Sequence, residues 1–399
     1  MGVIAPTRTT VAPVRPVMMW SESLLAYHFG PGHPMDPRRL ELTVRLAEAL
    51  GLLDRLDVVP PRLATDAELE LVHDPALLAA VRRAGATGEP QPGFGLGDSD
   101  TPVFPGMFDA AARVAGAAAE AAGLLASGRA RRAFSPAGGM HHAVASSAAG
   151  FCVFNDLAVA IALLRAHGPV VYVDLDVHHG DGVQQIFESD DRVTTISVHQ
   201  HPRSIFPHTG YPTETGSGAG RGHSVNLALP EDVTDAGWLR GLDAVVEPVL
   251  REVRPFALVT QHGCDTHAAD PLGGLAISVE AQREAARMLA GLADAHASGR
   301  WLAVGGGGYD LTVVPRVWTH VAAVVAGVGL DPATPTPEAW RQRARALTGQ
   351  PAPETMGDGV TVRWRPFHAG HDPADAVDRA IMATRNAAFP CLGLDPLTA

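Results

Sequence analysis

Three side chains of the types that bind divalent metals alternate along the segment DLDVHHGDG. They are Asp174, Asp176 and His178, and in an extended segment alternate side chains point to one side. A fourth, Asp265 in QHGCDTHAADP, can meet Asp176 and His178 if the apolar runs before the two segments form neighbouring strands. Two carboxylates and one imidazole leave a coordination position open, which is typical of a catalytic metal site. The alternatives at this point are a hydrogen-bonded polar strand end and an Asp265 that stabilises a turn.

A pair of adjacent histidines, His141 and His142, follows two glycines in GGMHHA. Hydrolysis at a metal requires a general base for water and a general acid for the leaving group, and histidine suits both near neutral pH. Asp174 and Asp181 are spare carboxylates near the same strand end, and a carboxylate behind an imidazole fixes its tautomer and raises its basicity. Taken alone, such a pair is more often a polar feature of the surface or the core than a catalytic one.

A glycine-rich turn, GGGGYD, follows the last apolar run and contains Tyr309. Glycines allow unusual backbone angles and close approach of a substrate. The phenol of Tyr309 can donate a hydrogen bond to the oxyanion that forms when water attacks an amide. The alternatives are a turn with a buried tyrosine and a phosphate-binding loop, and the second fails because the run lacks the GxxxxGK[ST] pattern.

Short apolar runs predict the strands that position these clusters. They read as buried β-strands separated by amphipathic helices, which indicates an α/β fold with a parallel sheet and a site at the carboxyl ends of its strands. The predicted strands are 170–174, 193–198, 256–260 and 301–305. The predicted helices are 37–56, 108–127, 236–253, 279–298 and 374–386. The Gly-, Pro- and Asp-rich stretch 85–107 reads as a long functional loop.

The composition of the 399 residues is that of a globular enzyme, with 46% hydrophobic and 19% charged residues. The net charge of −12 argues against a nucleic-acid partner and is compatible with a cationic substrate. The three cysteines form no CxxC cluster, which suits a reducing compartment. The N-terminal segment lacks the apolar run of a signal peptide, and no run is long enough to cross a membrane. We therefore expect a cytoplasmic protein without a membrane partner.

The joint order of these motifs resembles the histone deacetylase family. GHPMDPRRL, GGMHHA, GFCVFND, VDLDVHHGDGV, ISVHQ, FPHTG, QHGCDTH and GGGGYDL carry the resemblance over roughly residues 20–325. GRGHSVNLALP and ATRNAAFPCLGLDP are similar to the bacterial acetoin-utilisation type of deacetylase. The resemblance implies the arginase/deacetylase α/β fold, a single domain with an eight-stranded parallel sheet flanked by helices. We place the catalytic domain at 17–325 and a C-terminal extension, packed on or beside it, at 326–399.

The resemblance also implies a role for each residue of the site. The zinc ligands would be Asp176, His178 and Asp265, a set that also suits Fe(II) or Co(II). The catalytic residues would be His142 as general base and acid, His141 as its electrostatic partner, Asp181 behind His142, Asp174 behind His141, and Tyr309 as oxyanion donor. The walls and rim of a narrow acyl-lysine tunnel would be Gly150, Phe151, Phe206 and Leu272, with Asp100 as the rim residue that binds the substrate backbone.

The resemblance also implies structural potassium sites. The inner potassium site would be formed by Asp174, Asp176, His178, Ser197 and Val198. An outer site would use Phe187, Asp190 and Val193, but His223 stands where the family often has tyrosine. His208 likewise replaces the glycine of FPGTG, a difference from the family at the rim of the expected tunnel.

The predicted activity is hydrolysis of N-ε-acetyl-lysine in proteins or peptides to lysine and acetate, with metabolic enzymes as candidate targets. The first alternative within the family is an acetylpolyamine amidohydrolase. An arginase-like enzyme with two manganese ions would need a carboxylate two residues before Asp265, where the sequence has Gly263. An inactive acyl-lysine-binding scaffold is the remaining alternative, although every residue of the chemistry is present.

Overall fold

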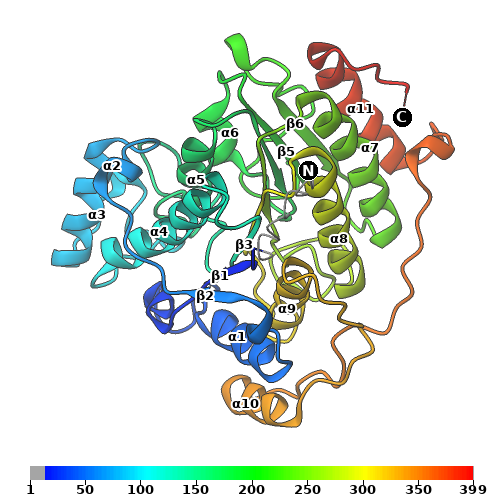
Figure 1. The fold of residues 1–399 in the computed structure, drawn as a ribbon. Helices are drawn as coiled ribbons and strands as arrows, with labels where there is room; N and C mark the ends of the chain where they lie inside the picture. The colour runs from blue at the N-terminus through cyan, green and yellow to red at the C-terminus, as the bar shows by residue number, and fades with distance from the viewer. Residues whose placement is uncertain (1–13, 399) are drawn as a thin grey trace, which may run out of the picture.

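One parallel sheet of eight strands forms the centre of the protein, which we describe from a computed structural model covering residues 14–398 (Figure 1). The strands lie in the order β2-β1-β3-β8-β7-β4-β5-β6, and every neighbouring pair is parallel. Their bounds are Val17–Met19 (β1), Asp57–Val59 (β2), Arg132–Ser135 (β3), Val170–Asp174 (β4), Val193–Gln200 (β5), Ser224–Leu229 (β6), Ala257–Gln261 (β7) and Trp301–Val304 (β8). The predicted α/β class with an eight-stranded parallel sheet is confirmed.

Helices cover both faces of this sheet. α4 and α5 pack together against one face, and α7, α8 and α9 cover the other (Figure 1). The helices are Arg38–Ala49 (α1), Asp66–Leu69 (α2), Pro75–Thr87 (α3), Met107–Ala126 (α4), Asp156–Leu164 (α5), Asp181–Phe187 (α6), Asp235–Val253 (α7), Val279–His296 (α8), Val314–Val325 (α9), Glu338–Thr348 (α10) and Ala376–Ala388 (α11). Among the described residues, no helix is long and apolar enough to cross a membrane.

The four predicted strands are β4, β5, β7 and β8, and every residue in them is buried. Continuous apolar runs are expected in a parallel sheet because helices exclude water from both of its faces. The predicted helix 37–56 was too long: α1 ends at Ala49, and Gly51 follows it in the left-handed conformation, with φ +70°, that commonly terminates a helix. The expectation about the N-terminal segment falls largely on residues 1–13, which lie outside the described residues.

Residues 326–398 extend along the outside of the sheet's helical layers and are held there by specific contacts (Figure 1). Near the start of this stretch, α10 packs on α1, and the indole of Trp340 donates a hydrogen bond to the Leu42 carbonyl at 2.9 Å. Near its end, α11 packs on α7 and β6, where Arg240 and Asp378 form a buried ion pair at 2.5 Å. The sequence predicted α11 but not α10.

The strand order brings the four chemical clusters together. β3, β8, β7 and β4 are consecutive neighbours in the sheet, and their carboxyl ends therefore open at one edge. The histidine pair follows β3, the glycine-tyrosine turn follows β8, Asp265 follows β7, and Asp176 follows β4. The order of the strands thus brings segments that are far apart in the sequence together at one edge of the sheet.

Candidate active site

Asp176, His178 and Asp265 form a buried cluster whose potential ligand atoms all lie within 4.8 Å of one another. Nδ1 of His178 is 3.0 Å from Oδ1 of Asp176 and 3.3 Å from Oδ2 of Asp265. The backbone after β4 turns instead of continuing as a strand, so the convergence comes from this turn and from the loop after β7, not from alternation along an extended chain. The structure nevertheless brings the three predicted ligands together.

The donor set fits a divalent transition metal. Oδ2 of Asp265 is buried and has no hydrogen-bond partner among the described residues, whereas Oδ1 accepts the N–H of Val177 at 2.9 Å. Burial and the neighbouring Asp176 carboxylate raise the pKa of Asp265, and the two carboxylates overcome burial to raise the pKa of His178 to about 10. A bound cation would stabilise the charged carboxylate of Asp265 and the neutral imidazole of His178, and so would lower both pKa values. Glycine is required at position 263, since a Cβ there would lie 2.4 Å from Oδ2 of Asp176, and this leaves no place for the second carboxylate of a two-metal site.

Other polar groups hold Asp176 in place. Its Oδ2 accepts hydrogen bonds from Nε2 of Gln261 at 2.6 Å and from the N–H of Gly307 at 2.8 Å. These contacts fix the orientation of the carboxylate, and its Oδ1 also accepts the backbone N–H of His178 at 3.1 Å. Gln261, the last residue of β7, was not predicted, although a polar side chain at the end of an apolar strand is a usable signal.

The two histidines each have a carboxylate behind the ring. Nδ1 of His141 lies 2.8 Å from Asp174, and Nδ1 of His142 lies 2.6 Å from Asp181. Although burial opposes it, the negative charge of Asp174 and Asp176 raises the pKa of His141 to about 9. Burial and the neighbouring His141 lower the pKa of His142 to about 4. The predicted pairing of each imidazole with its own aspartate is thus present in the structure.

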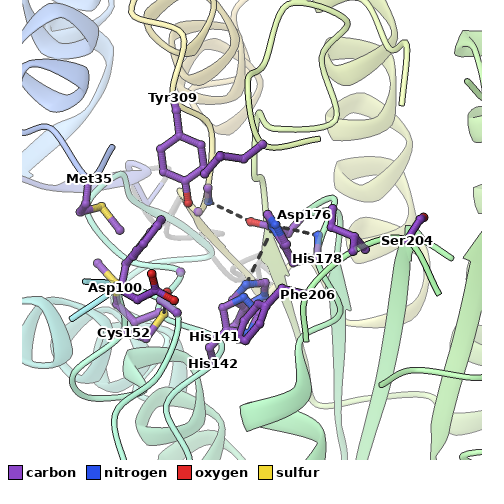
Figure 2. A pocket seen from close by; sticks show the side chains of 18 residues that line it. Met35, Asp100, His141, His142, Cys152, Asp176, His178, Ser204, Phe206 and Tyr309 are labelled. Carbon is purple, nitrogen blue, oxygen red and sulfur yellow. Dashed lines mark hydrogen bonds and ion pairs between the residues drawn. The ribbon is translucent and has the colours of Figure 1, made fainter. Parts of the chain in front are cut away.

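Tyr309 points its hydroxyl into the cavity beside the metal cluster (Figure 2). Burial and the carboxylates of Asp265 and Asp176 raise the pKa of its phenol well above the usual value, which keeps the phenol protonated. Its ring lies edge-on to Phe151, with 5.7 Å between ring centroids. Its backbone N–H donates to Oδ2 of Asp270 at 2.7 Å. Asp270 is a second residue that the sequence analysis missed, because its contact depends on how two loops fold against each other.

The cavity in front of this group has a volume of about 310 Å³ and is lined by residues from both sides of the tunnel that we expected (Figure 2). Gly150, Phe151, Phe206 and Leu272 all contribute, and the rings of Phe206 and His142 meet at 5.0 Å. Gly150 has φ +51°, and a Cβ there would lie 2.5 Å from the His142 ring, so only glycine allows this wall to approach the histidine. Phe206 and Leu272 are 41% and 37% exposed, which places them at the mouth. Met35 and Cys152 also line the cavity and were not predicted to do so.

Asp100 lies at the same cavity, on an ordered turn. Oδ1 of Asp98 accepts the N–H groups of Asp100 and Thr101 at 3.0 and 2.7 Å, and Nε2 of His33 is 3.3 Å from the Asp100 carbonyl. The turn is therefore fixed by its backbone, while the Asp100 side chain remains exposed to solvent.

The residues expected to bind the inner potassium also lie together. Asp174 at the end of β4 is in register with Ser197 of β5, and its Oδ1 accepts the N–H of Asp176 at 3.1 Å. The Ser197 hydroxyl lies 2.9 Å from Nδ1 of His199. At the outer position, His223 lies 2.7 Å from the hydroxyl of Thr194.

A family model described as "Histone deacetylase domain" matches residues 33–325. The chain therefore belongs to the histone deacetylase family, and with this site it is a hydrolase of the deacetylase type.

Among its relatives is the acetoin utilization protein AcuC of Bacillus subtilis, which is 39% identical over 81% of this chain and 85% of its own length. AcuC of Staphylococcus xylosus is 35% identical over the same shares of the two chains. A solved structure of a histone deacetylase homologue from Aquifex aeolicus superposes with a TM-score of 0.81 at 28% identity, over 93% of this chain and 100% of that one. A structure of a histone deacetylase homologue with SAHA gives the same score and identity.

Proposed function

We propose that this protein is a zinc-dependent lysine deacetylase that hydrolyses N-ε-acetyl-lysine in proteins or peptides to lysine and acetate. One observation carries the proposal: the ligand cluster, the His142–Asp181 pair and the Tyr309 hydroxyl face one cavity of about 310 Å³ with an apolar wall. Such a cavity accepts a long apolar stem with a single polar group at its inner end. Relatives named for acetoin utilization support a metabolic setting.

The residues of the site divide the work of amide hydrolysis among them. A zinc ion held by Asp176, His178 and Asp265 would polarise the acetyl carbonyl and acidify a water. Asp181 accepts the Nδ1–H of His142, and this leaves Nε2 free to take the proton of the attacking water. The Tyr309 hydroxyl donates to the carbonyl oxygen as negative charge develops there. His142 then gives its proton to the lysine nitrogen as the C–N bond breaks. The positively charged His141 stabilises the negative charge that develops on the reacting amide during this transfer.

The proposal also covers the identity of the catalytic metal and the presence of a structural potassium ion. Two carboxylates and one imidazole suit zinc and are also compatible with Fe(II) or Co(II). We assign the inner potassium to Asp174, Asp176, His178, Ser197 and Val198. Such a monovalent ion would fix the backbone from which the zinc ligands project.

A peptide substrate is favoured over a free polyamine because of Asp100. A carboxylate at the mouth of the cavity can accept hydrogen bonds from two consecutive backbone N–H groups of a peptide, whereas an acetylated polyamine has no such backbone. Hydrogen bonds to charged groups contribute about 1.5–3 kcal/mol each, and less at an exposed position. Asp100→Ala should therefore lower kcat/KM for an acetyl-lysine peptide about 10- to 100-fold.

The test compares wild type and Asp100→Ala, each with an acetyl-lysine peptide and with an acetylpolyamine. We expect wild type to prefer the peptide and the substitution to affect the peptide far more than the polyamine. Equal losses on both substrates would contradict the role of Asp100. A wild-type preference for the polyamine would instead make the protein an acetylpolyamine amidohydrolase.

A further inference from the structure

Asp358 lies beyond the residues that match the family model, yet its side chain reaches the loop that carries Asp265. We infer that Asp358 is a positioning residue for the metal site, through which the C-terminal segment holds the loop after β7 in its active shape. The inference rests on the proposed role of Asp265 as a metal ligand. It assigns a contribution to catalysis to a part of the chain outside the matched domain.

The Asp358 carboxylate joins three elements. Its Oδ2 lies 3.1 Å from Nε2 of His267 in the loop and accepts the N–H of Val279, the first residue of α8, at 2.8 Å. Its Oδ1 accepts a hydrogen bond from Nη1 of Arg316, on α9, at 2.8 Å. All three partners present hydrogen to Asp358, and only a carboxylate can accept from all of them. Although partial burial opposes it, these donors hold the pKa of Asp358 well below its usual range.

His267 transmits this contact to the loop. Its Nδ1 accepts the N–H of Ala269 at 3.0 Å, so Nε2 carries the hydrogen that points at Asp358, and a neutral imidazole satisfies both contacts. The His267 backbone N–H donates to the carbonyl of Cys264, and its carbonyl accepts the N–H of Asp270. Fixing the ring of His267 therefore fixes a turn with Asp265 on one side and Asp270 on the other.

Both ends of this turn face the reacting centre. Asp265 offers its unpartnered oxygen to the metal position, and Asp270 accepts the backbone N–H of Tyr309. Arg316 lies in α9, the helix that follows the Tyr309 turn. The single carboxylate of Asp358 thus steadies the ligand loop and the helix behind the oxyanion donor together.

The segment around Asp358 is itself held firmly. The Glu280 carboxylate accepts the backbone N–H groups of Asp358, Gly359 and Val360 at 2.9, 2.9 and 3.3 Å. A Cβ at position 357 would lie 2.4 Å from Oε1 of Glu280, so Gly357 permits this close approach. An anchored carboxylate can restrain a neighbouring loop, which a carboxylate on a loose tail could not do.

The experiment measures zinc affinity of full-length variants by competition with a chromogenic chelator, together with kcat and KM on an acetyl-lysine peptide. Loss of a partner behind a metal ligand typically weakens metal binding about 10- to 100-fold. Asp358 acts through His267 and does not contact a ligand directly, so we expect Asp358→Asn to weaken zinc binding about tenfold, the lower end of that range, and to lower kcat with little change in KM. His267→Leu removes the same link from the other side, so it should have a similar effect, and the double variant should bind zinc no more weakly than the weaker single variant.

Asp243→Asn is the matched control. Asp243, on α7, accepts the N–H of Phe367 at 2.7 Å and so anchors the same C-terminal segment away from the site. We expect it to keep the wild-type zinc affinity even if it lowers the unfolding temperature. Wild-type zinc affinity in Asp358→Asn, or an equal loss in Asp243→Asn, would overturn the inference. Failure of the wild-type protein to bind zinc or turn over the peptide would instead refute the proposed function.

Discussion

Replacing Tyr309 with phenylalanine isolates one hydroxyl at the centre of the proposed chemistry. Within the part of the chain that the structure describes, this hydroxyl makes no hydrogen bond, and Figure 2 shows it directed into the cavity. The ring is held independently of the hydroxyl by Phe151 and by the Arg39 guanidinium, which lies 5.5 Å from the ring centroid. The substitution should therefore leave the fold and the ring position intact.

The expected loss follows from what the hydroxyl does only during the reaction. Loss of one oxyanion donor costs about 2.7–4 kcal/mol, which is about 10²- to 10³-fold in kcat. The KM should change little, because the bond becomes strong only when the carbonyl oxygen gains charge. Steady-state kinetics on an acetyl-lysine peptide, with the unfolding temperature as a check on the fold, measure both effects. Tyr211→Phe is the control, since Tyr211 does not line the cavity. A kcat within threefold of wild type in Tyr309→Phe would refute the reasoning.

Two further predictions concern the metal and the C-terminal helix. Elemental analysis should find about one divalent transition metal per chain, whereas two tightly bound manganese ions would support the arginase-like alternative. Asp378→Asn should lower the free energy of unfolding, measured by urea unfolding, by about 3 kcal/mol. This value is near the lower end for a broken buried ion pair because Arg240 keeps its hydrogen bonds to backbone carbonyls. Although burial opposes it, Arg240 lowers the pKa of Asp378 in the folded protein. The stability contributed by the ion pair is therefore present above the unfolded pKa of about 3.9 and is lost as the pH falls through the lower folded pKa. A stability loss in Asp378→Asn that is equal at all pH values would contradict this assignment.

The sequence predicted the central strands of the fold better than its margins. β4, β7 and β8 are apolar along most of their length because they are buried on both faces, and such runs are visible without a structure. β2 is a short edge strand with exposed residues and so has no apolar run. β6, the strand at the other edge of the sheet, begins with alternating polar and apolar residues in SVNLAL and was not predicted. Their place in the sheet depends on pairing with distant strands.

In the candidate site, too, one group of residues could be predicted from the sequence and another could not. Residues that can bind a metal or move a proton were recognisable by type and spacing, and the structure brings Asp176, His178 and Asp265 within reach of one ion. The residues that orient them were not recognisable. Asp358 meets His267 across 91 positions, and Gln261 meets Asp176 across 85, so no local pattern records either contact. A side chain that acts only through another can be found only once the chain is folded.

Turnover by the metal-free and the zinc-reconstituted protein is the most direct test of the central claim. The metal is removed with a chelator, one equivalent of zinc is returned, and the release of acetate from an acetyl-lysine peptide and the formation of the deacetylated peptide are measured before and after. We predict no turnover without metal and equal amounts of acetate and deacetylated peptide once zinc is restored. Turnover that survives complete metal removal, or zinc-loaded protein that releases no acetate, would contradict the account.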